Sequence, residues 1–287
     1  MSDAAVVGFV GLGNMGRVLC ANLVAAGHRV VAYDVAGPDR VPDGARPGAD
    51  VADVARQADV VVCSLPDGAA SASVAEEIIA VADRRVTHVI DTSTTGVPGA
   101  RSVAARLAEV GVVLVDAPVS GGIAGARART LSVMVAADAD ACAHVQPVLA
   151  GLSDNIRRVG DRPGLAQALK LANNFLSATA LAATSEAVAF GVSVGLDMAT
   201  MVEVLSASSG HNTATSDKFP NHVVTGRFAS GFSNSLMDKD IQLYLGAVAE
   251  QGTPATVGAV TADVWHRFAA AEPGVDFTRI YPFVEGG

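Results

Sequence analysis

A glycine-rich turn near the start of the chain constrains its fold more than any other feature. The β-branched run AVVGFV leads directly into Gly11-Leu12-Gly13-Asn14-Met15-Gly16, and a helical stretch follows. In such a turn the first glycine allows a tight bend, the second lets a pyrophosphate approach the backbone, and the third lets helix pack on strand. The N–H groups at the helix start favour an anion. The sequence therefore predicts a dinucleotide-binding turn.

Short β-branched runs alternate with Ala-rich helical stretches as far as Gly160. The runs are AVVGFV, HRVVAYD, ADVVVCSLP, VTHVIDTST, VGVVLVDAP and TLSVMVAAD. This alternation predicts a parallel sheet with helices on both faces. Beyond Gly160 only helical patterns follow, over residues 163–195, 198–207, 234–251 and 254–271. We expect an α/β fold: a doubly wound Rossmann domain over residues 1–161, and an all-helical domain over 162–287 joined to it by a long helix.

An aspartate ends the second expected strand. Asp34 follows the run RVVAY and lies 18 residues after Gly16. A carboxylate there can accept hydrogen bonds from both hydroxyls of an adenosine ribose and repels a 2′-phosphate. No basic residue follows directly, because residues 35–37 are Val-Ala-Gly. We expect NAD to be preferred, with NADP possible; the alternative is that Asp34 only caps the strand.

Charge and composition exclude other classes of function. Lys and Arg total 20 against 29 Asp and Glu, and no basic run could follow a phosphate backbone, so nucleic acid is not an expected partner. The three cysteines lie far apart without metal-ligand spacing, which predicts reduced thiols and no metal. The start lacks a signal-peptide pattern, and uncharged stretches fall short of about 18 apolar residues. We expect a cytoplasmic protein without a membrane contact.

Lys170 is the only charged side chain in residues 165–185. At helical spacing it shares a polar face with Gln167, Asn174 and Ser177 on an otherwise apolar helix. Desolvation would lower the pKa of such a lysine from about 10.4 toward neutrality, where a general acid or base works. We expect Lys170 to exchange protons; the alternative is a surface lysine whose stem covers the helix start.

Four motifs occur in order along nearly the whole chain. They are GFVGLGNMG at residues 8–16, DAPVSGG at 116–122, GLAQALKLANN at 164–174 and LMDKD at 236–240. In these motifs the chain resembles the β-hydroxyacid dehydrogenases, the 3-hydroxyisobutyrate dehydrogenase family. The resemblance implies a Rossmann domain, a helical domain, and NAD(P)-dependent oxidation of a 3-hydroxy acid at the cleft between them. A homodimer or homotetramer is expected by the same analogy.

The resemblance also implies roles for individual residues. Ser120, Gly121 and Gly122 fall where the family holds the substrate carboxylate, through groups that suit an anion. Lys170 matches the catalytic lysine and Asn174 its neighbouring asparagine, and both contact substrate. The positions that match the cofactor site, besides the glycine turn and Asp34, are Leu65, Pro66, Thr94 and, on the nicotinamide side, Lys239.

The segment after DAPVSGG departs from the family pattern. Residues 122–131 read GIAGARARTL, so Arg129 stands where the family has glycine. Either Arg127 and Arg129 lie in solvent or cap a contact, or one of them reaches the cleft and binds a second anionic group of the substrate. The usual glycine pair after the next strand is Ala136-Ala137, which we expect to affect packing alone. His211 is expected to be a solvated loop residue.

Three functions remain open from the sequence. The leading one is hydride transfer between NAD(P) and a small 3-hydroxy acid, with Lys170 taking the hydroxyl proton and Asn174 orienting the lysine. An imine reductase on the same fold is a second possibility, but imine reductases generally lack the lysine. The third is a non-catalytic dinucleotide-binding protein. Relatives of that kind have a replaced lysine, so Lys170 argues against both alternatives.

Overall fold

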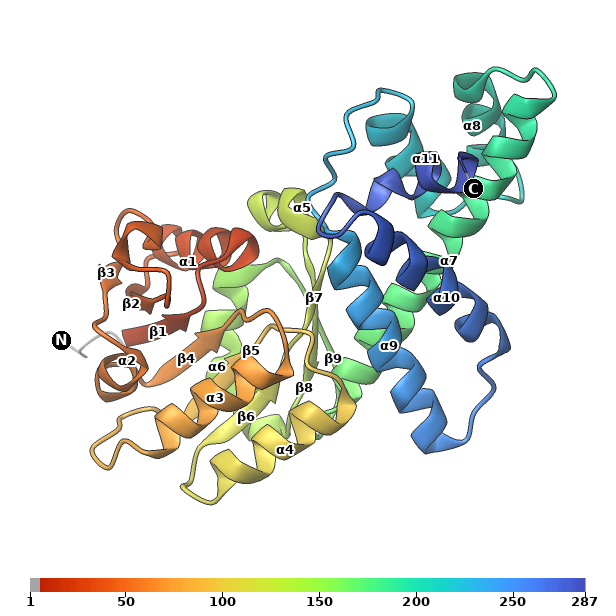
Figure 1. The fold of residues 1–287 in the computed structure, drawn as a ribbon. Helices are drawn as coiled ribbons and strands as arrows, with labels where there is room; N and C mark the ends of the chain where they lie inside the picture. Colours follow the sequence, from red (N-terminus) through yellow and green to blue (C-terminus); the bar gives the residue numbers. More distant parts are fainter. Residues whose placement is uncertain (1–5, 287) are drawn as a thin grey trace. The chain divides into compact units, whose positions relative to one another are not determined.

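The computed structural model describes residues 6–286 and contains two compact units, one ending at Lys170 and one beginning at Leu171. Figure 1 shows that the strands belong to the first unit and that the second is helical. The division falls within the long helix α7 (Leu165–Ser193), which the sequence predicts over residues 163–195. The start of the chain, on which the expectation of no signal peptide rests, lies outside the described residues.

The strands of the first unit form one sheet in the order β3-β2-β1-β4-β5-β6-β8-β7, with β9 paired to β8. They are β1 (Val6–Val10), β2 (Arg29–Tyr33), β3 (Arg46–Pro47), β4 (Val60–Cys63), β5 (His88–Asp91), β6 (Val113–Asp116), β7 (Val119–Ser120), β8 (Ser132–Ala136) and β9 (Asn155–Gly160). The first six neighbours have the strand order of a Rossmann sheet. The predicted Rossmann fold is therefore confirmed.

One edge of the sheet departs from the parallel arrangement. Strand β8 runs antiparallel to β6 and β7. The helix between β7 and β8, α5 (Gly122–Ala128), has 7 residues. Such a helix spans only about 10 Å, which is too short for the crossover that a parallel pair needs. The sequence predicts β8 as a strand of a parallel sheet, and its antiparallel pairing with β6 and β7 corrects that prediction. Strands β3, β7 and β9 are not predicted.

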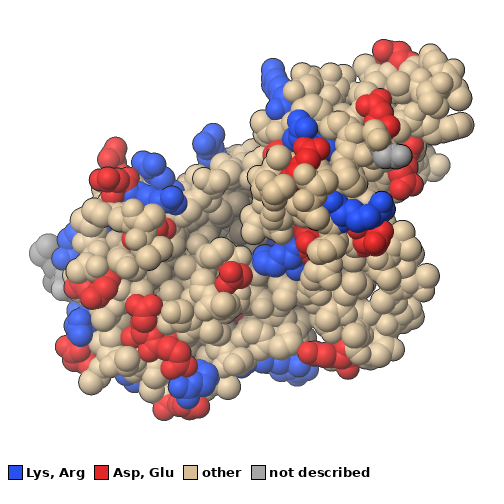
Figure 2. Space-filling view, in the orientation of Figure 1, with Lys and Arg blue, Asp and Glu red and all other residues tan. Residues whose placement is uncertain are grey.

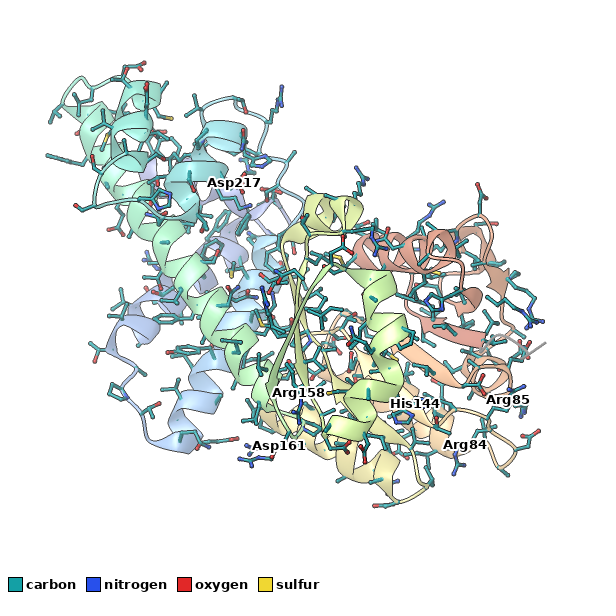
Figure 3. All side chains as sticks on the ribbon, turned by 180° about the vertical axis from the view of Figure 1, so that it is seen from behind. Arg84, Arg85, His144, Arg158, Asp161 and Asp217 are labelled. Carbon is teal, nitrogen blue, oxygen red and sulfur yellow. The ribbon has the colours of Figure 1, made fainter. Side chains whose placement is uncertain are left out.

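Two layers of helices cover the sheet. Helices α1 (Asn14–Ala25) and α6 (Ala139–Leu152) share one apolar core, and α2 (Val51–Gln57), α3 (Gly68–Ile79) and α4 (Val97–Ala108) share the other. Figure 1 shows α3 and α4 in front of the sheet, and Figure 3, seen from behind, shows α6 with His144 on the opposite face. Because central strands such as β4 are buried on both faces, their sequences read as continuous apolar runs.

The second unit is built around aromatic side chains. Trp265, Phe219 and Phe268 are fully buried, and the indole N–H of Trp265 donates to the carbonyl oxygen of Ala178 at 3.2 Å. Besides α7, the helices are α8 (Met198–Ser206), the π-helix η2 (Ala214–Val223), α9 (Asn234–Gln251), α10 (Thr256–Ala271), η3 (Phe277–Arg279) and α11 (Ile280–Glu285). The sequence predicts α7 to α10. It does not predict η2, which contains Pro220.

Helix α7 is long and apolar enough, by length and composition alone, to cross a membrane. Its most apolar window of 18 residues has a mean hydropathy of 1.4. Ala178, Leu181 and Val188 of this helix pack into the core of the second unit. The expectation that the chain makes no membrane contact stays a prediction.

Candidate active site

The glycine-rich turn joins β1 to α1. At two of its three glycines a side chain would collide with neighbouring atoms, and at the third it would meet none. Gly11 has a φ of +92°, and a Cβ there would lie 2.4 Å from the carbonyl oxygen of Ser64. A Cβ on Gly16 would lie 1.9 Å from the carbonyl oxygen of Gly11, so only glycine lets the helix begin this close to the strand. At Gly13 a Cβ would meet nothing within 4 Å. The backbone at Gly13 is therefore open to a ligand at the start of α1.

The three other residues of the turn have different environments. Leu12 is buried in the core, Met15 packs against it, and Asn14 is exposed at the first position of α1. Because the Leu12 side chain points inward, its backbone is the part that can face a ligand.

Asp34 follows β2 and binds the turn directly. Its carboxylate accepts hydrogen bonds from the N–H of Leu12 at 2.5 Å and from the N–H of Ala36 at 2.8 Å. The guanidinium of Arg40, in the short helix η1 (Pro38–Arg40), lies 3.9 Å from the same carboxylate. Residues 35–37 carry no basic side chain, so the local sequence does not reveal this cation; η1 brings Arg40 back toward Asp34. The carboxylate lies beside the turn, where a ribose bound there would meet it.

The loops after β4 and β5 lie against the glycine turn. A Cβ on Gly11 would also lie 2.9 Å from Leu65 Cδ2, which places the loop of Leu65 and Pro66 beside the turn. The N–H of Leu65 donates to Ser93 Oγ at 2.8 Å, and Thr94 follows in the same loop. The structure thus gathers Leu65 and the glycine turn at the carboxyl ends of parallel strands, where Rossmann folds bind their ligands.

Ser120, Gly121 and Gly122 form the bend between β7 and α5. Ser120 pairs with Ser132 of β8. Gly121 and Gly122 have φ values of +130° and +67°, both are exposed, and a Cβ on Gly122 would meet nothing within 4 Å. Because both glycines are exposed and lack a side chain, a ligand such as a carboxylate could approach the backbone of this bend.

Arg129 has a structural role at the end of α6. Its guanidinium donates to the carbonyl oxygens of Gly151 at 2.8 Å and Ala150 at 2.6 Å, and to Asp154 Oδ1 at 3.1 Å. These contacts cap the last turn of α6. Arg129 also adopts a φ of +59°, the conformation for which glycine is favoured. The structure contradicts the idea that Arg129 binds a substrate anion and supports a capping role; Arg127 is exposed in the last turn of α5.

The polar face of α7 carries two of the expected site residues. Lys170 is 8% exposed and Asn174 is 5% exposed, so neither is a solvated surface residue. They are four residues apart on one continuous helix and therefore lie on the same face. The interpretation of Lys170 as a surface lysine is contradicted by this burial.

Asp240 is not among the residues predicted from the sequence, and it links Asn174 to Lys239. Its carboxylate is buried at 2% exposure, and Oδ2 accepts a hydrogen bond from Asn174 Nδ2 at 2.5 Å. Its Oδ1 lies 2.8 Å from Lys239 Nζ, as an ion pair rather than a directed hydrogen bond. Asn173 Nδ2 in turn donates to Asn174 Oδ1 at 3.1 Å. The signal was available, because Asp240 is the last residue of the LMDKD motif.

Three other kinds of side chain could have formed a site: metal ligands, cysteines and the loop histidine His211. Among residues 6–286, no group of three His, Cys, Asp or Glu side chains could hold a metal ion. Cys20 is buried, and burial raises the pKa of its thiol to about 12. His211 is exposed, as expected of a loop histidine.

Two family models of known proteins match this chain, one over each part of it. The sequence-family model of the NAD binding domain of 6-phosphogluconate dehydrogenase matches residues 6–160. The model described as the NAD-binding domain of NADP-dependent 3-hydroxyisobutyrate dehydrogenase matches residues 164–284. Together the two models span nearly the whole chain.

Full-length relatives are also found. A 3-hydroxyisobutyrate dehydrogenase of Pseudomonas aeruginosa is 37% identical, over 100% of this chain and 99% of its own. The solved 3-hydroxyisobutyrate dehydrogenase of Mycobacterium tuberculosis with L-serine has a TM-score of 0.87 at 33% identity, covering 98% of this chain and 99% of its own. An imine reductase of Streptomyces aurantiacus, 21% identical with a TM-score of 0.66 over 97% of this chain and 99% of its own, shares the fold.

Proposed function

Since the chain belongs to the β-hydroxyacid dehydrogenase family, whose NAD(P)-dependent enzymes transfer a hydride between the cofactor and a small 3-hydroxy acid, we propose that Lys170 is the general acid and base of this reaction. The observation that carries the proposal is the burial of Lys170, at 8% exposure, on the polar face of α7. An amine held on the polar face of an otherwise apolar helix suits a proton-transfer role.

The first unit fits a dinucleotide. The open backbone at Gly13 and the helix start behind it suit a pyrophosphate, and Asp34 lies where a ribose would present its hydroxyls. When bound, the nicotinamide ring accepts a hydride from the carbon that carries the hydroxyl, or returns it. We propose that NAD is preferred, because the Asp34 carboxylate would repel a 2′-phosphate. Arg40, beside it, leaves some use of NADP possible.

The chain's own residues hold the acid and move one proton. Ser120, Gly121 and Gly122 bind the substrate carboxylate with backbone N–H groups and a hydroxyl. Lys170 Nζ, as the neutral amine, takes the hydroxyl proton as the C–H bond at the same carbon breaks, and it returns the proton in the reverse direction. Fixing these groups in place lowers the barrier by orientation. Asn174 orients the lysine.

The family resemblance assigns Lys239 to the nicotinamide side of the site. Its ammonium forms an ion pair with Asp240. The buried carboxylate of Asp240 fixes the Asn174 amide and the Lys239 ammonium at once. Because one carboxylate serves both, a change at Asp240 should alter both the proton-transfer side and the cofactor side of the reaction.

Asp240→Asn is expected to lower kcat/KM by about 10-fold, because the neutral amide loses the ion pair and can turn an N–H group toward Asn174 Nδ2. Steady-state kinetics with varied cofactor and varied substrate measure the change. Asp238→Asn is the matched control: this carboxylate, on the same helix, contacts Gln242 and His266 instead. An Asp240 variant with wild-type constants would refute the linking role.

Arg129→Gly is expected to leave KM within about 2-fold of wild type for monocarboxylate and dicarboxylate 3-hydroxy acids alike, since the guanidinium binds α6 rather than substrate. Glycine relieves the positive φ but loses three hydrogen bonds, so the melting temperature should fall by a few degrees (about 2–4 °C). Kinetics and thermal unfolding test both statements. A KM that rises only for the dicarboxylate would restore Arg129 to the site.

An imine reductase is the competing activity, and Lys170 argues against it. The solved imine reductases share the fold at low identity, which carries no information on substrate. Initial rates separate the two activities: 3-hydroxy acids with NAD or NADP, 2-hydroxy acids as controls, and cyclic imines with the reduced cofactors. We expect reduced cofactor to form with 3-hydroxy acids. Turnover of imines alone would contradict the proposal.

We propose a cytoplasmic homodimer or homotetramer without nucleic-acid or membrane partners. The formal charge of −9 supports the absence of a nucleic-acid partner. On the face drawn in Figure 2, basic side chains lie among acidic ones rather than in one basic patch. The bacterial relatives support the location. Sedimentation of the purified protein would give the oligomeric state.

A further inference from the structure

Gln167 is buried at the start of α7 and uses its whole amide group. Its Oε1 accepts hydrogen bonds from the backbone N–H groups of Thr95 at 2.9 Å and Gly96 at 3.2 Å. Its Nε2 donates to the carbonyl oxygen of Ser93 at 3.1 Å and to Asp116 Oδ1 at 2.8 Å. A primary amide has two N–H donors and one carbonyl acceptor with two lone pairs. Every bond the side chain can make is therefore made, at 1% exposure.

Asp116 completes the connection from the end of β6. Its Oδ2 accepts hydrogen bonds from the N–H of Gly164 at 2.8 Å and from the N–H of Gln167 at 3.3 Å. Burial raises the pKa of Asp116 to about 6; the bonds from Gln167 and Gly164 oppose the rise, and the charge of Asp91 adds to it. In its ionised form the carboxylate accepts all three bonds, one from Gly164 just before α7 and two from Gln167 on α7. One buried pair thus ties the start of α7 to β6 and to the loop of residues 93–96.

Building on the proposed role of Lys170, we propose that Gln167 and Asp116 are positioning residues that fix the rotation of α7 and so the place of the Lys170 amine. Lys170 follows Gln167 by three residues, so the two side chains leave neighbouring points of one helix face. A turn or slip of the helix at Gln167 moves Lys170 with it. A displacement of about 1 Å at a reacting group can cost about 100-fold in rate.

The Gln167 amide also holds the loop of residues 93–96, which lies on the cofactor side of the proposed site. Its partners Ser93, Thr95 and Gly96 surround Thr94, which is assigned to the cofactor. One side chain therefore holds the loop of Thr94 and the helix of Lys170 in fixed relation. A buried amide is a costly anchor, because each unmade bond is penalised. Apolar packing could hold a helix end against a sheet more simply, but it would not fix its rotation as closely.

The test exchanges the amide at position 167 and the carboxylate at position 116. In Gln167→Glu the new carboxylate faces Ser93 O and Asp116 Oδ1 without a donor, and in Asp116→Asn two amide N–H groups face each other. Each single variant should lower kcat by about 30-fold, with KM changed less than about 3-fold. In the double variant the amide at position 116 can donate to the carboxylate at position 167, and its oxygen still accepts from the N–H groups of Gly164 and of residue 167. The carbonyl oxygen of Ser93 stays without its donor, so we expect kcat to recover in part, to within about 10-fold of wild type.

A second measurement needs no substrate. Amide hydrogen exchange of the peptide spanning residues 164–171 should be faster in each single variant and return toward wild type in the double variant. Gln57→Glu is the matched control. Gln57 Nε2 donates to Asp53 Oδ1 at 2.6 Å on α2, so the same chemical change occurs beside a carboxylate on another helix. It should leave both kcat and the exchange of residues 164–171 unchanged.

The outcomes separate this inference from the proposed function. Single variants with wild-type kcat, or a double variant no better than the worse single, would overturn the positioning role. If a single variant does not fold, Gln167→Met replaces it, with the same expected loss of kcat and faster exchange. A wild-type protein without turnover would contradict the proposed function instead, and the exchange measurement alone would then decide the positioning role.

Discussion

Lys170→Ala is expected to lower kcat by about 100-fold or more while leaving NADH binding nearly unchanged. The loss has the size of a missing general acid or base. Cofactor binding should survive, because the glycine turn and Asp34 form a separate set of contacts at the ends of β1 and β2. Steady-state kinetics give the first quantity, and NADH fluorescence titration gives the second. Near wild-type turnover at neutral pH would remove Lys170 from the reaction.

Two further variants separate proton transfer from charge and from stability. Lys170→Arg keeps a positive charge but cannot give up a proton near neutral pH, so it should be as impaired as the alanine variant. Lys218→Ala removes a lysine that pairs with Asp217, which is labelled in Figure 3, on η2. It should keep wild-type kcat. An active arginine variant would show that charge alone is required of Lys170.

Asp34→Arg is expected to reverse the choice of cofactor. The carboxylate that would receive the ribose hydroxyls is replaced by a cation that can pair with a 2′-phosphate, next to Arg40, which is already there. We expect kcat/KM for NAD to fall by about 100-fold and kcat/KM for NADP to rise by about 10-fold. Measuring both constants in the wild type and the variant tests this. A wild type that already prefers NADP would refute the assignment of Asp34.

The loop bonds of Asp34 need their own control. Asp34 accepts N–H groups of Leu12 and Ala36, so part of any loss could come from a loosened turn. Asp34→Asn keeps the size of the side chain and removes only the charge, so it should weaken discrimination without reversing it. Arg40→Ala should lower use of NADP further. If Asp34→Asn lost both cofactors equally, loop disruption rather than charge would explain the effect.

Much of the fold follows from local patterns. The strands β1, β2, β4, β5, β6 and β8 are apolar runs, and α7 to α10 show helical periodicity, so each can be predicted without its neighbours. The two-residue strands β3 and β7 are too short to carry a pattern. Strand β9 contains the exposed Arg157 and Arg158, which hide its pairing with β8. The direction of β8 depends on how far its connection reaches, which is a property of the fold.

The residues proposed for the site differ in how easily the sequence reveals them. The glycine turn, Asp34 and Lys170 can be predicted because each is unusual in its own segment. Asp240 is bonded to Asn174, 66 residues earlier, and Gln167 to Asp116, 51 residues earlier. Arg129 is the reverse case: its sequence context suggested an anion partner, yet its guanidinium reaches the end of α6. Contacts of this range cannot be read from spacing.

The measurement that tests the central claim most directly follows the hydride itself. Wild-type protein is incubated with NAD and a 3-hydroxy acid that carries deuterium on the hydroxyl-bearing carbon, and the reduced cofactor is analysed by mass spectrometry. We predict that the reduced cofactor gains one deuterium and that Lys170→Ala forms it at least about 100-fold more slowly. Reduced cofactor without deuterium, or none with any 3-hydroxy acid, would contradict the account.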